Sequence, residues 1–331
     1  MKIGLYGYGS IGRLLARTAL SRGHEIVGVV DIDPGIIGKD AGVLAGVGEI
    51  GVRVSRDPGI LGMADVVLHA TSSYLDKVYT QLLEIIDMRI DIVSTCETLA
   101  YPYYRYPVLA RRIQKAAWDK GVTVIGSGIN PGFLLDFLPA VMAVPVDVVE
   151  KIEAVRSVDA SKRRIPFQKK IGIGLSPEEF REKLDKGEIT GHVGYAESIY
   201  IIADALGIEL SDVKEGQEPV ITDKDLVYRN NVFPAGTVIG LKGYGIGIID
   251  EKEIIRIEFH AYLGAPEYEE IRIKGANYSI SWRSTGTPGD QATAAVVLSI
   301  AEKIKEYPPG LITIADLIPF KPRIKTPTRK Y

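Results

Sequence analysis

The sequence predicts an α/β protein with a doubly wound parallel sheet, joined to an α+β domain with an open, largely antiparallel sheet. Over residues 1–143, short apolar segments alternate with amphipathic segments, which is typical of parallel strands and their connecting helices. Over residues 144–285, longer segments alternate between apolar and polar positions, which favours antiparallel strands with one exposed face. The length of 331 residues agrees with two domains of ordinary size.

The first domain begins with a strand at 2–6, and the glycine-rich segment GYGSIG then opens a helix that ends at Gly23. A second strand at 25–33 completes a strand–helix–strand unit within about 30 residues. The same rhythm continues along the domain, with strands expected at 64–72, 91–96 and 122–128 and helices at 74–88 and 107–121.

The second domain is expected to contain long strands at 147–161, 237–250, 253–263 and 267–284, and helices at 176–187 and 196–207. A long helix follows within 287–310 and is stopped by Pro-Pro-Gly. We expect this helix to pack against the first domain, so that 286–331 completes that domain and 144–285 is an insertion. The basic tail at 321–331 is interpreted as an exposed arm or an oligomer contact.

The composition excludes several classes of protein. A net charge of −2 provides no basic surface for nucleic acid, and no apolar run is long enough to cross a membrane. Cys96 is the single cysteine, which excludes an intrachain disulfide and a cysteine-rich zinc site. Four histidines without ligand spacing predict no metal. We therefore expect a cytoplasmic protein, and the interleaved Glu and Lys residues suggest a thermophilic source.

The segment GYGSIG predicts a dinucleotide-binding loop and therefore a Rossmann-type domain. Gly7 permits the tight turn, Gly9 lets a pyrophosphate approach the backbone, and Gly12 lets the helix pack closely against the strand. The backbone N–H groups of Ser10 and Ile11, at the start of the helix, add donors for the phosphates. Because the segment follows a strand and opens a helix, we expect it to bind NAD or NADP.

Asp31 ends the second strand, about 20 residues after the loop, where a carboxylate accepts hydrogen bonds from the adenine ribose hydroxyls. A carboxylate at this position repels a 2′-phosphate, so the sequence favours NAD over NADP. Two alternatives stay open. Asp33 can bind the ribose or simply form the turn before Pro34. Arg13 and Lys39 can also offset the charge of a 2′-phosphate.

The segment HATSS at 69–73 lies at the carboxyl end of the next expected strand, where ligands of open α/β sheets bind. The small residues Thr71 and Ser72 would let the ribose and nicotinamide of the cofactor pass over the backbone. Ser73 is equally suited to cap the helix that follows.

Glu97 follows the strand at 91–96 in the equivalent position, and the tyrosine-rich segment YPYYRYP begins a few residues later. A carboxylate among apolar and tyrosyl groups is suited to proton transfer near neutral pH, which makes Glu97 the candidate catalytic residue. A helix cap or a surface acid in a strand–helix loop is the alternative interpretation.

Asn130 lies in a second unusual junction, GSGINPG, where a strand, several glycines and a proline are expected to open an apolar helix. It either caps the helix or directs its amide toward the cofactor or the substrate. His192, in the segment GHVG ahead of another helix, is a candidate site residue. His24 and His69 are interpreted as structural, and His260 as a half-buried residue of the sheet.

Several segments together resemble the 2,4-diaminopentanoate dehydrogenase family, which includes the native amine dehydrogenases and is related in fold to dihydrodipicolinate reductase. The segments, which span nearly the whole chain, are GYGSIGR, GKDAG, STCETLAYP, GSGINPGFLLDFLP, VRSVDAS, GHVGYAES and PGDQATAAVVLSIAEKI. The resemblance implies NAD(P)-dependent oxidative deamination of an amine to a ketone, or the reverse reductive amination. It also implies that Glu97 is the acid/base and that Asn130 and His192 line the substrate pocket.

The implied chemistry makes specific demands on the protein. Hydride transfer from the amine carbon to the nicotinamide gives an imine and requires a neutral amine, so a base must hold the amine proton. Water then attacks the imine carbon, and Glu97 can serve both steps. A diamino acid also carries a carboxylate, for which Arg163, Arg164 and Arg283 are candidates. The alternative for the segment SKRRIPF is a solvated basic loop.

Two other functions stay open from the sequence. An enzyme similar to dihydrodipicolinate reductase would reduce a cyclic C=N bond, although the histidine-rich helix signature of that family is not found. A non-catalytic NAD-binding sensor would bind the cofactor without turnover and without any need for Glu97. The expected partner is a small-molecule amine or amino acid. The open sheet of the second domain also predicts a homodimer, because its outer face needs to be covered.

Overall fold

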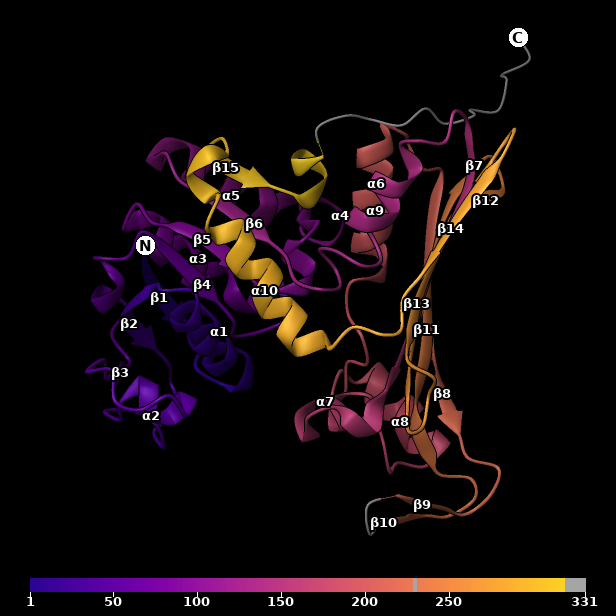
Figure 1. Ribbon diagram of the computed structural model, residues 1–331, viewed down its shortest axis with the longest axis horizontal. Coiled ribbons are helices and arrows are strands. Elements are labelled where there is room, and N and C mark those ends of the chain that lie inside the picture. Colours follow the sequence, from indigo (N-terminus) through magenta and orange to yellow (C-terminus); the bar gives the residue numbers. More distant parts are fainter. Residues whose placement is uncertain (229–230, 319–331) are drawn as a thin grey trace. The chain divides into compact units, whose positions relative to one another are not determined.

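The computed structural model of the chain describes two compact units (Figure 1). The described residues are 1–228 and 231–318. Unit 1 comprises Met1–Phe133 and Pro288–Leu317, and the described part of unit 2 comprises residues 134–228, 231–287 and 318. The basic tail at 321–331 lies outside the described residues.

The division between the units falls after Phe133, whereas the sequence led us to expect it at residue 143. The difference is due to helix α6 (Phe137–Ala143), which packs against strands of unit 2. The apolar residues of this short helix do not reveal which of two sheets they cover, so the boundary could not be read from the local sequence.

Unit 1 is built on a seven-stranded sheet in the order β15-β6-β5-β4-β1-β2-β3, and all its neighbouring strands are parallel. The strands are β1 (Lys2–Tyr6), β2 (Glu25–Val30), β3 (Val54–Ser55), β4 (Val66–His69), β5 (Asp91–Ser94), β6 (Thr123–Gly126) and β15 (Gly310–Ile312). The chain runs outward from β1 to β3 and then returns to β4 on the other side of β1. The doubly wound parallel sheet is thereby confirmed, with its switch point between β1 and β4.

Helices cover both faces of this sheet. They are α1 (Ser10–Ser21), α2 (Ala41–Ala45), α3 (Leu75–Asp87), α4 (Pro102–Arg105), α5 (Pro107–Lys120) and α10 (Gly289–Ala301). Helices α3 and α5 pack together and bury Leu82 and Ile113 against apolar strand residues such as Ile92. Their apolar residues recur at helical spacing, which is why the sequence predicted them closely.

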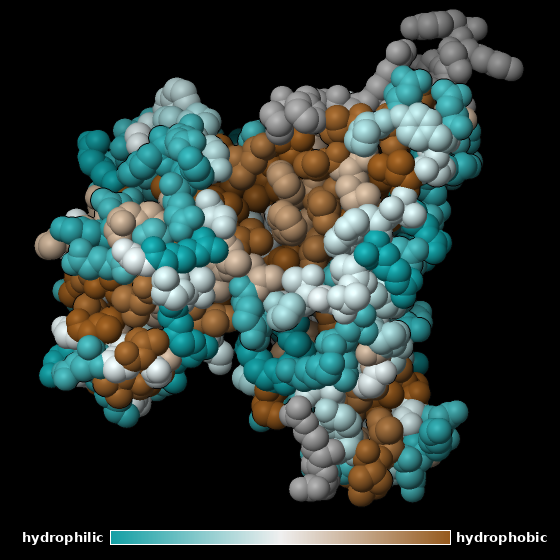
Figure 2. All heavy atoms as spheres, in the orientation of Figure 1, coloured by the Kyte–Doolittle hydropathy of each residue, from teal (hydrophilic) through white to brown (hydrophobic). Residues whose placement is uncertain are grey.

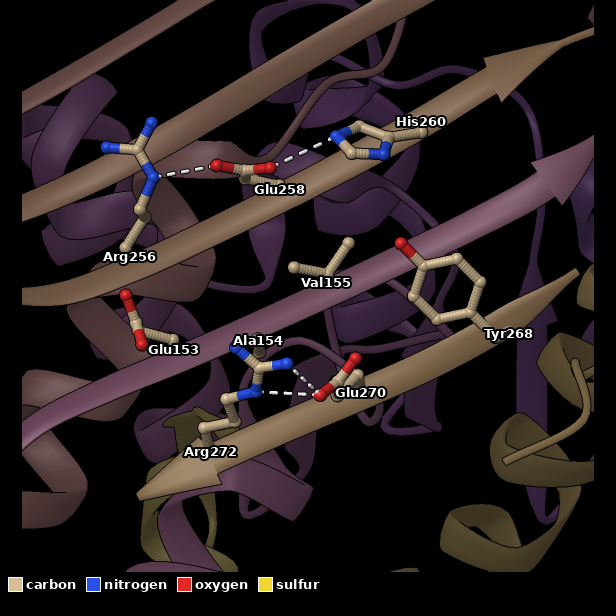
Figure 3. Close-up of a pocket in the computed structure, with 9 residues that line it drawn as sticks. All are labelled: Glu153, Ala154, Val155, Arg256, Glu258, His260, Tyr268, Glu270 and Arg272. Atoms are coloured by element: carbon tan, nitrogen blue, oxygen red, sulfur yellow. Dashed lines mark hydrogen bonds and ion pairs between the residues drawn. The ribbon is translucent and has the colours of Figure 1, made fainter. Parts of the chain in front are cut away.

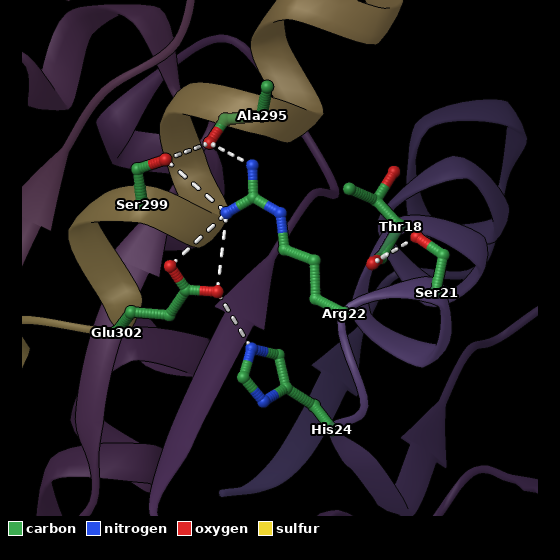
Figure 4. Close-up of polar contacts among 7 residues, drawn as sticks. All are labelled: Thr18, Ser21, Arg22, His24, Ala295, Ser299 and Glu302. Atoms are coloured by element: carbon green, nitrogen blue, oxygen red, sulfur yellow. Dashed lines mark hydrogen bonds and ion pairs between the residues drawn. The ribbon is translucent and has the colours of Figure 1, made fainter.

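Helix α10 packs beside α1 and is held there by polar contacts (Figure 4). Arg22 donates to both carboxylate oxygens of Glu302 at 3.3 Å and to the backbone oxygen of Ala295 at 3.4 Å. His24 Nε2 lies 2.8 Å from Glu302 Oε1, and this hydrogen bond, aided by Arg22, lowers the pKa of Glu302. The chain then adds β15 to the edge of the sheet, a strand of three residues that is too short to predict from periodicity.

Unit 2 contains a six-stranded sheet in the order β14-β13-β7-β12-β11-β8. Its strands are β7 (Val149–Asp159), β8 (Asp212–Ile221), β11 (Val238–Ile249), β12 (Lys252–Tyr262), β13 (Tyr268–Gly275) and β14 (Ser279–Arg283). Neighbouring strands are antiparallel except for the parallel pair β7 and β12. The predicted open, largely antiparallel sheet is confirmed, although β8, with its many charged residues, was not predicted.

Helices α6 and α9 (Tyr195–Leu206) cover one face of the unit 2 sheet, while α7 (Ile165–Lys170) and α8 (Pro177–Asp185) lie toward one end (Figure 1). Strand β11 presents glycines to α9 at every second position. A Cβ atom at Gly243 would lie 2.0 Å from Tyr195 Oη, and one at Gly247 would lie 2.9 Å from Ile199. The segment GYGIG therefore lets the helix approach the sheet closely.

The opposite face of this sheet, here called the outer face, carries charged side chains that pair with one another (Figure 3). Arg256 Nε donates to Glu258 Oε1 at 2.7 Å, and His260 Nε2 lies 3.1 Å from Glu258 Oε2. Arg272 pairs with Glu270 in the same way on β13. Burial alone would raise the pKa of Glu258, but the hydrogen bond from Arg256 lowers it. The prediction that His260 is half-buried is confirmed.

A short hairpin extends from unit 2 and consists of β9 (Leu226–Tyr228) and β10 (Asn231–Phe233). Val227 and Val232 are 70% and 62% exposed, and Figure 2 shows hydrophobic residues at this position on the surface. No helix within the described residues has the length and apolar character needed to span a membrane.

Candidate active site

The glycine loop follows β1 at the switch point of the unit 1 sheet. Gly7 has a φ of +92°, and a Cβ atom there would lie 2.5 Å from the backbone oxygen of Ala70. A Cβ atom at Gly12 would lie 2.0 Å from the oxygen of Gly7. Both glycines are therefore required by the fold itself, because β1, β4 and α1 meet without space for a side chain.

Gly9 differs from the other two glycines, since a Cβ atom there would meet no described atom within 4 Å. It is the N-cap of α1, where no described side chain caps the helix and the first turn contains no acidic residue. The N–H groups of Ser10 and Ile11 begin this turn, and the positive end of the helix dipole lies there. Bare backbone facing open space at a helix N-terminus fits the pyrophosphate of a dinucleotide.

Asp31 directly follows β2 and lies against the glycine loop. Its Oδ2 accepts a hydrogen bond from Tyr8 N, and its Oδ1 accepts one from Asp33 N at 2.9 Å. Asp33 Oδ1 in turn accepts from Gly35 N at 2.8 Å. This contact is typical of a turn, which was one of the two interpretations of Asp33 that the sequence allowed. Arg13 Nε donates to Tyr8 O at 3.1 Å, so this cation also lies at the loop.

Thr71 and Ser72 follow β4 on the other side of the switch point. Thr71 is exposed, and its hydroxyl donates to Gln81 Oε1 at 2.7 Å. The prediction that Ser73 is the N-cap of α3 was wrong. The N-cap is Tyr74, and Thr98 Oγ1, far away in sequence, accepts from Leu75 N at 2.8 Å.

Glu97 begins a 3₁₀ turn, η2 (Glu97–Leu99), just after β5, and it is half-buried. Strands β4 and β5 run parallel with His69 opposite Ser94, so Glu97 and Thr71 follow neighbouring strands at the same edge of the sheet. The adjacent Cys96 is buried, and burial, followed by the charge of Glu97, raises its pKa to about 12. Cys96 is therefore a protonated thiol and a poor nucleophile.

Asn130 lies in unit 1 after β6. Neither Nδ2 nor Oδ1 of this buried amide has a hydrogen-bond partner among the described residues. The prediction that this junction opens a helix was wrong, because residues 131–136 form turns and α6 begins at Phe137 with Asp136 as its cap. Asn130 therefore caps nothing. A buried amide without partners costs on the order of 1–3 kcal/mol, which favours a ligand-binding role.

His192 lies in unit 2, where its ring packs edge-on against Tyr195 at 4.8 Å and at a tilt of 42° against Phe259 at 4.7 Å, both between ring centroids. Burial, together with the positive charges of Lys170 and Arg156, lowers its pKa to about 3. His192 is therefore neutral at neutral pH. It can donate or accept a hydrogen bond, but it does not act as a cation.

The candidate arginines for a substrate carboxylate have different surroundings within unit 2. The Arg163 guanidinium lies 4.5 Å from the centroid of the Phe167 ring, in a cation–π contact. Arg283 binds Glu270 at 2.9 Å and lies over the Tyr268 ring on the outer face. Since Phe259, which contacts His192, belongs to the inner core of the unit, Arg283 and His192 are on opposite faces of the sheet.

A buried ion pair in unit 2 was missed by the sequence reasoning. Arg156 and Glu269 are 2% and 1% exposed, and Arg156 Nε lies 3.3 Å from Glu269 Oε1. Arg156 also donates to Thr287 O at 3.0 Å. A signal was present, because the alternation of β7 places Arg156 on the same face as the apolar Ile152 and Ala154. Among the described residues, no three His, Cys, Asp or Glu side chains cluster as metal ligands.

Comparison with known proteins identifies the family of this chain. Residues 133–329 match the family model for the 2,4-diaminopentanoate dehydrogenase C-terminal domain, and residues 1–95 match that for the dihydrodipicolinate reductase N-terminus. The 2,4-diaminopentanoate dehydrogenase of Acetoanaerobium sticklandii is 32% identical over 336 residues, covering 96% of this chain and 93% of that protein.

Two solved structures show the same fold. The amine dehydrogenase of Mycobacterium smegmatis gives a TM-score of 0.84 at 20% identity and covers 95% of both chains. GenD2 of gentamicin A biosynthesis, solved in complex with NAD, gives a TM-score of 0.56 at 12% identity and covers 96% of this chain and 90% of its own. From the family match over most of its length, the chain belongs to the 2,4-diaminopentanoate dehydrogenase family, whose members are oxidoreductases acting on CH–NH₂ donors.

Proposed function

We propose that the protein is an NAD-dependent dehydrogenase that deaminates a small amine or a diamino acid similar to 2,4-diaminopentanoate, and that catalyses reductive amination in the reverse direction. The observation that carries this proposal is the position of Glu97. It follows β5 at the same sheet edge as Thr71, beside the switch point where the glycine loop lies. Family membership supplies the reaction class.

The proposed cofactor is held by residues of unit 1. The Gly9 backbone and the start of α1 would receive the pyrophosphate, Asp31 the adenine ribose, and Thr71 and Ser72 the nicotinamide half. The bound nicotinamide supplies the hydride acceptor. NAD is favoured over NADP because Asp31, fixed against the loop, repels a 2′-phosphate. A structural neighbour solved with NAD is consistent with this choice.

Glu97 is proposed to manage the protons of the reaction. As a carboxylate, it accepts the proton of the substrate ammonium, which leaves a nitrogen lone pair able to assist hydride departure from the adjacent carbon. It then accepts a proton from the water that attacks the resulting C=N carbon, and it returns a proton to the departing ammonia. One half-buried carboxylate serves both steps if its first proton is passed on before the water attacks.

Three residues are proposed to contact the substrate. Asn130 offers a buried amide whose two polar atoms have no partner among the described residues, so a substrate nitrogen or a water can pair with it. His192, neutral because of its surroundings, offers a hydrogen bond without a charge. Arg163 is the proposed partner of a carboxylate if the substrate is a diamino acid, and the cation–π contact with Phe167 orients its guanidinium.

The test is reduction of NAD and NADP by a panel of simple amines and diamino acids at alkaline pH, with wild type beside Glu97→Gln. We expect turnover that falls by at least about 100-fold in the variant, with unchanged NAD affinity, because the base is lost. Glu25→Gln is the matched control, since Glu25 is exposed at the amino end of β2 and should keep full activity.

Other outcomes would identify the alternative functions. Reduction of a cyclic C=N substrate without amine turnover would favour the dihydrodipicolinate reductase-like reaction. Tight NAD binding without turnover of any substrate would favour the sensor. Turnover that survives Glu97→Gln would contradict the role of Glu97. The cytoplasmic location and the thermophilic source stay predictions from the sequence.

We also propose that the protein forms a homodimer through the outer face of the unit 2 sheet. This face contains a hollow of about 290 Å³ lined by both charged and apolar groups, including Val155 and Tyr268 (Figure 3). Its charges already pair within one chain, as Arg256 does with Glu258. A second copy could therefore cover them without leaving a buried charge unpaired, which is the usual cost of a polar interface.

Sedimentation equilibrium at micromolar concentration tests the dimer. We expect wild type to sediment as a dimer and Val155→Glu to shift toward monomer, because a third carboxylate between Glu258 and Glu270 adds an unpaired, repelled charge to the outer face. Val43→Glu is the control, since Val43 is 59% exposed in unit 1. A monomeric wild type would contradict the proposal.

A further inference from the structure

His69 is a polar residue in a position that packing alone would fill with an apolar one. It ends β4 with no exposed surface, directly after the buried residues Val66, Val67 and Leu68. Its ring nevertheless makes three polar contacts. Nδ1 lies 2.8 Å from Ser94 Oγ on β5, and Nε2 lies 2.9 Å from Gln81 Oε1 and 3.0 Å from Thr71 Oγ1.

The partners of His69 determine where its proton lies. Gln81 Oε1 is an acceptor only, so Nε2 carries the hydrogen, and Nδ1 accepts from the Ser94 hydroxyl. Ser94 Oγ also accepts from Cys96 N at 3.1 Å, while the Thr71 hydroxyl donates to Gln81. Burial lowers the pKa of His69 to about 4, so the ring is neutral at neutral pH, and its single N–H faces Gln81 Oε1 and Thr71 Oγ1.

On one side, the network reaches the turn that carries Glu97. The contact of Ser94 Oγ with Cys96 N fixes the backbone one residue before Glu97. Thr98, one residue after it, donates from its backbone N to Ser73 O at 3.1 Å. The turn at Glu97 is thus anchored on one side by Ser94 at the end of β5 and on the other by Ser73, which lies between β4 and α3.

On the other side, the network determines whether the Thr71 hydroxyl donates or accepts a hydrogen bond toward a ligand. The Thr71 hydroxyl donates its hydrogen to Gln81 Oε1, and one lone pair of its oxygen accepts from Nε2–H of His69. Toward a ligand, the exposed Thr71 can therefore only accept a hydrogen bond. The matching ligand group is a donor, such as a ribose hydroxyl or a carboxamide N–H, and not a phosphate oxygen.

We propose that His69 is a positioning residue for the reaction, which as a neutral imidazole holds the Thr71 hydroxyl as an acceptor toward the cofactor and fixes the turn that carries Glu97. This inference rests on the proposed function, because it takes Thr71 as a cofactor contact and Glu97 as the base. The two effects are exerted through different ring nitrogens, so they can be separated experimentally.

The test replaces one ring nitrogen at a time. The His69→Asn amide reaches the place of Nδ1 and keeps the Ser94 contact, so we expect NADH to bind about tenfold more weakly while kcat at saturating cofactor is preserved. The His69→Gln amide reaches the place of Nε2 and keeps the Gln81 and Thr71 contacts but loses the contact with Ser94, so we expect the opposite division between cofactor binding and kcat. NADH affinity should be preserved, and kcat should fall about tenfold.

Asp91→Ala is the matched control for stability. Asp91 is buried at the amino end of β5, where it accepts from Thr123 N at 2.7 Å, and its loss should lower the melting temperature without changing NADH affinity or kcat. If both His69 variants behave like Asp91→Ala, the proposal is overturned and His69 is structural. Equal losses of NADH affinity and kcat in both variants would also overturn the proposal, because the contact with Thr71 and the contact with Ser94 would then not have separate effects.

A second pair of variants applies if the His69 variants do not fold. Ser94→Ala should lower kcat alone, and Gln81→Leu should weaken NADH binding alone; the opposite pattern would overturn the proposal. Direct NADH titration needs no substrate, so it tests the Thr71 side even if no amine is turned over. Failure of the proposed reaction and failure of this inference are thereby distinguishable.

Discussion

At the scale of single residues, Asn130 combines a cost in stability with a proposed role in binding. Both polar atoms of its side chain are buried without a partner among the described residues. Folding therefore removes the amide from water without replacing its hydrogen bonds, which costs on the order of 1–3 kcal/mol. Such groups persist where a ligand supplies the missing partners.

This reasoning predicts opposite effects on stability and activity for Asn130→Leu. Leucine is similar in size and has no polar atoms in its side chain, so the free energy of unfolding should stay the same or rise by about 1 kcal/mol. At the same time, kcat/KM for the amine should fall by about 100-fold, because a substrate contact is lost. Urea titration and steady-state kinetics provide the two measurements.

The exposed Asn277→Leu, in a turn of unit 2, is the control and should change neither quantity. A variant at Asn130 that loses about 2 kcal/mol of stability but retains activity would show that the amide has a structural role.

At the scale of secondary-structure elements, the junction of β1 and α1 contains two kinds of glycine. Gly12 is required by packing, because a Cβ atom would lie 2.0 Å from the oxygen of Gly7. Gly9 is not, because its φ of −71° suits any residue and a Cβ atom there would have no described neighbour within 4 Å. One motif thus serves the fold and the proposed cofactor through different positions.

The two glycines should therefore respond differently to alanine. Gly9→Ala is expected to change the free energy of unfolding by less than about 0.5 kcal/mol, and to weaken NAD binding about tenfold or more because the methyl group occupies the approach of the pyrophosphate. Gly12→Ala is expected to destabilise the protein by about 1–3 kcal/mol through overpacking. Thermal unfolding and NADH titration separate these effects, and equal loss of stability in both variants would refute the distinction.

At the scale of the whole molecule, each unit contains a histidine whose pKa is lowered far enough to keep it neutral: His69, buried in unit 1, and His192, half-buried in unit 2. Burial lowers the pKa of His69 to about 4, and burial with the nearby cations Lys170 and Arg156 lowers that of His192 to about 3. An unfolded histidine titrates near pH 6.5. Between these values the unfolded chain binds more protons than the folded chain, so both units lose stability as the pH falls below about 6.5.

The predicted acid sensitivity can be measured by urea titration at pH 7 and at pH 4.5. For wild type, His69 alone should reduce the free energy of unfolding by about 2 kcal/mol between these values. His69→Gln cannot titrate, so its loss over the same interval should be smaller by about that amount. An equal loss in both proteins would contradict the assignment of a depressed pKa to His69.

The sequence by itself determined the features that depend on neighbours along the chain. Alternating apolar segments predicted the parallel sheet, and the spacing of Gly7, Gly9 and Gly12 predicted the dinucleotide loop, because strand–turn–helix geometry is local. The positions of Asp31 and Glu97 after strands followed from the same pattern. Parallel strands bring their carboxyl ends to one edge, so local order was enough to bring these residues to the same side of the sheet.

The tertiary structure alone decided the features that depend on distant partners. It paired His69 with Ser94, placed Thr98 at the start of α3, and buried Arg156 beside Glu269. It also replaced the helix expected after Asn130 with turns, because α6 begins only at Phe137. Each of these contacts joins residues separated by many positions, and local periodicity carries no information about which distant group will meet a buried polar atom.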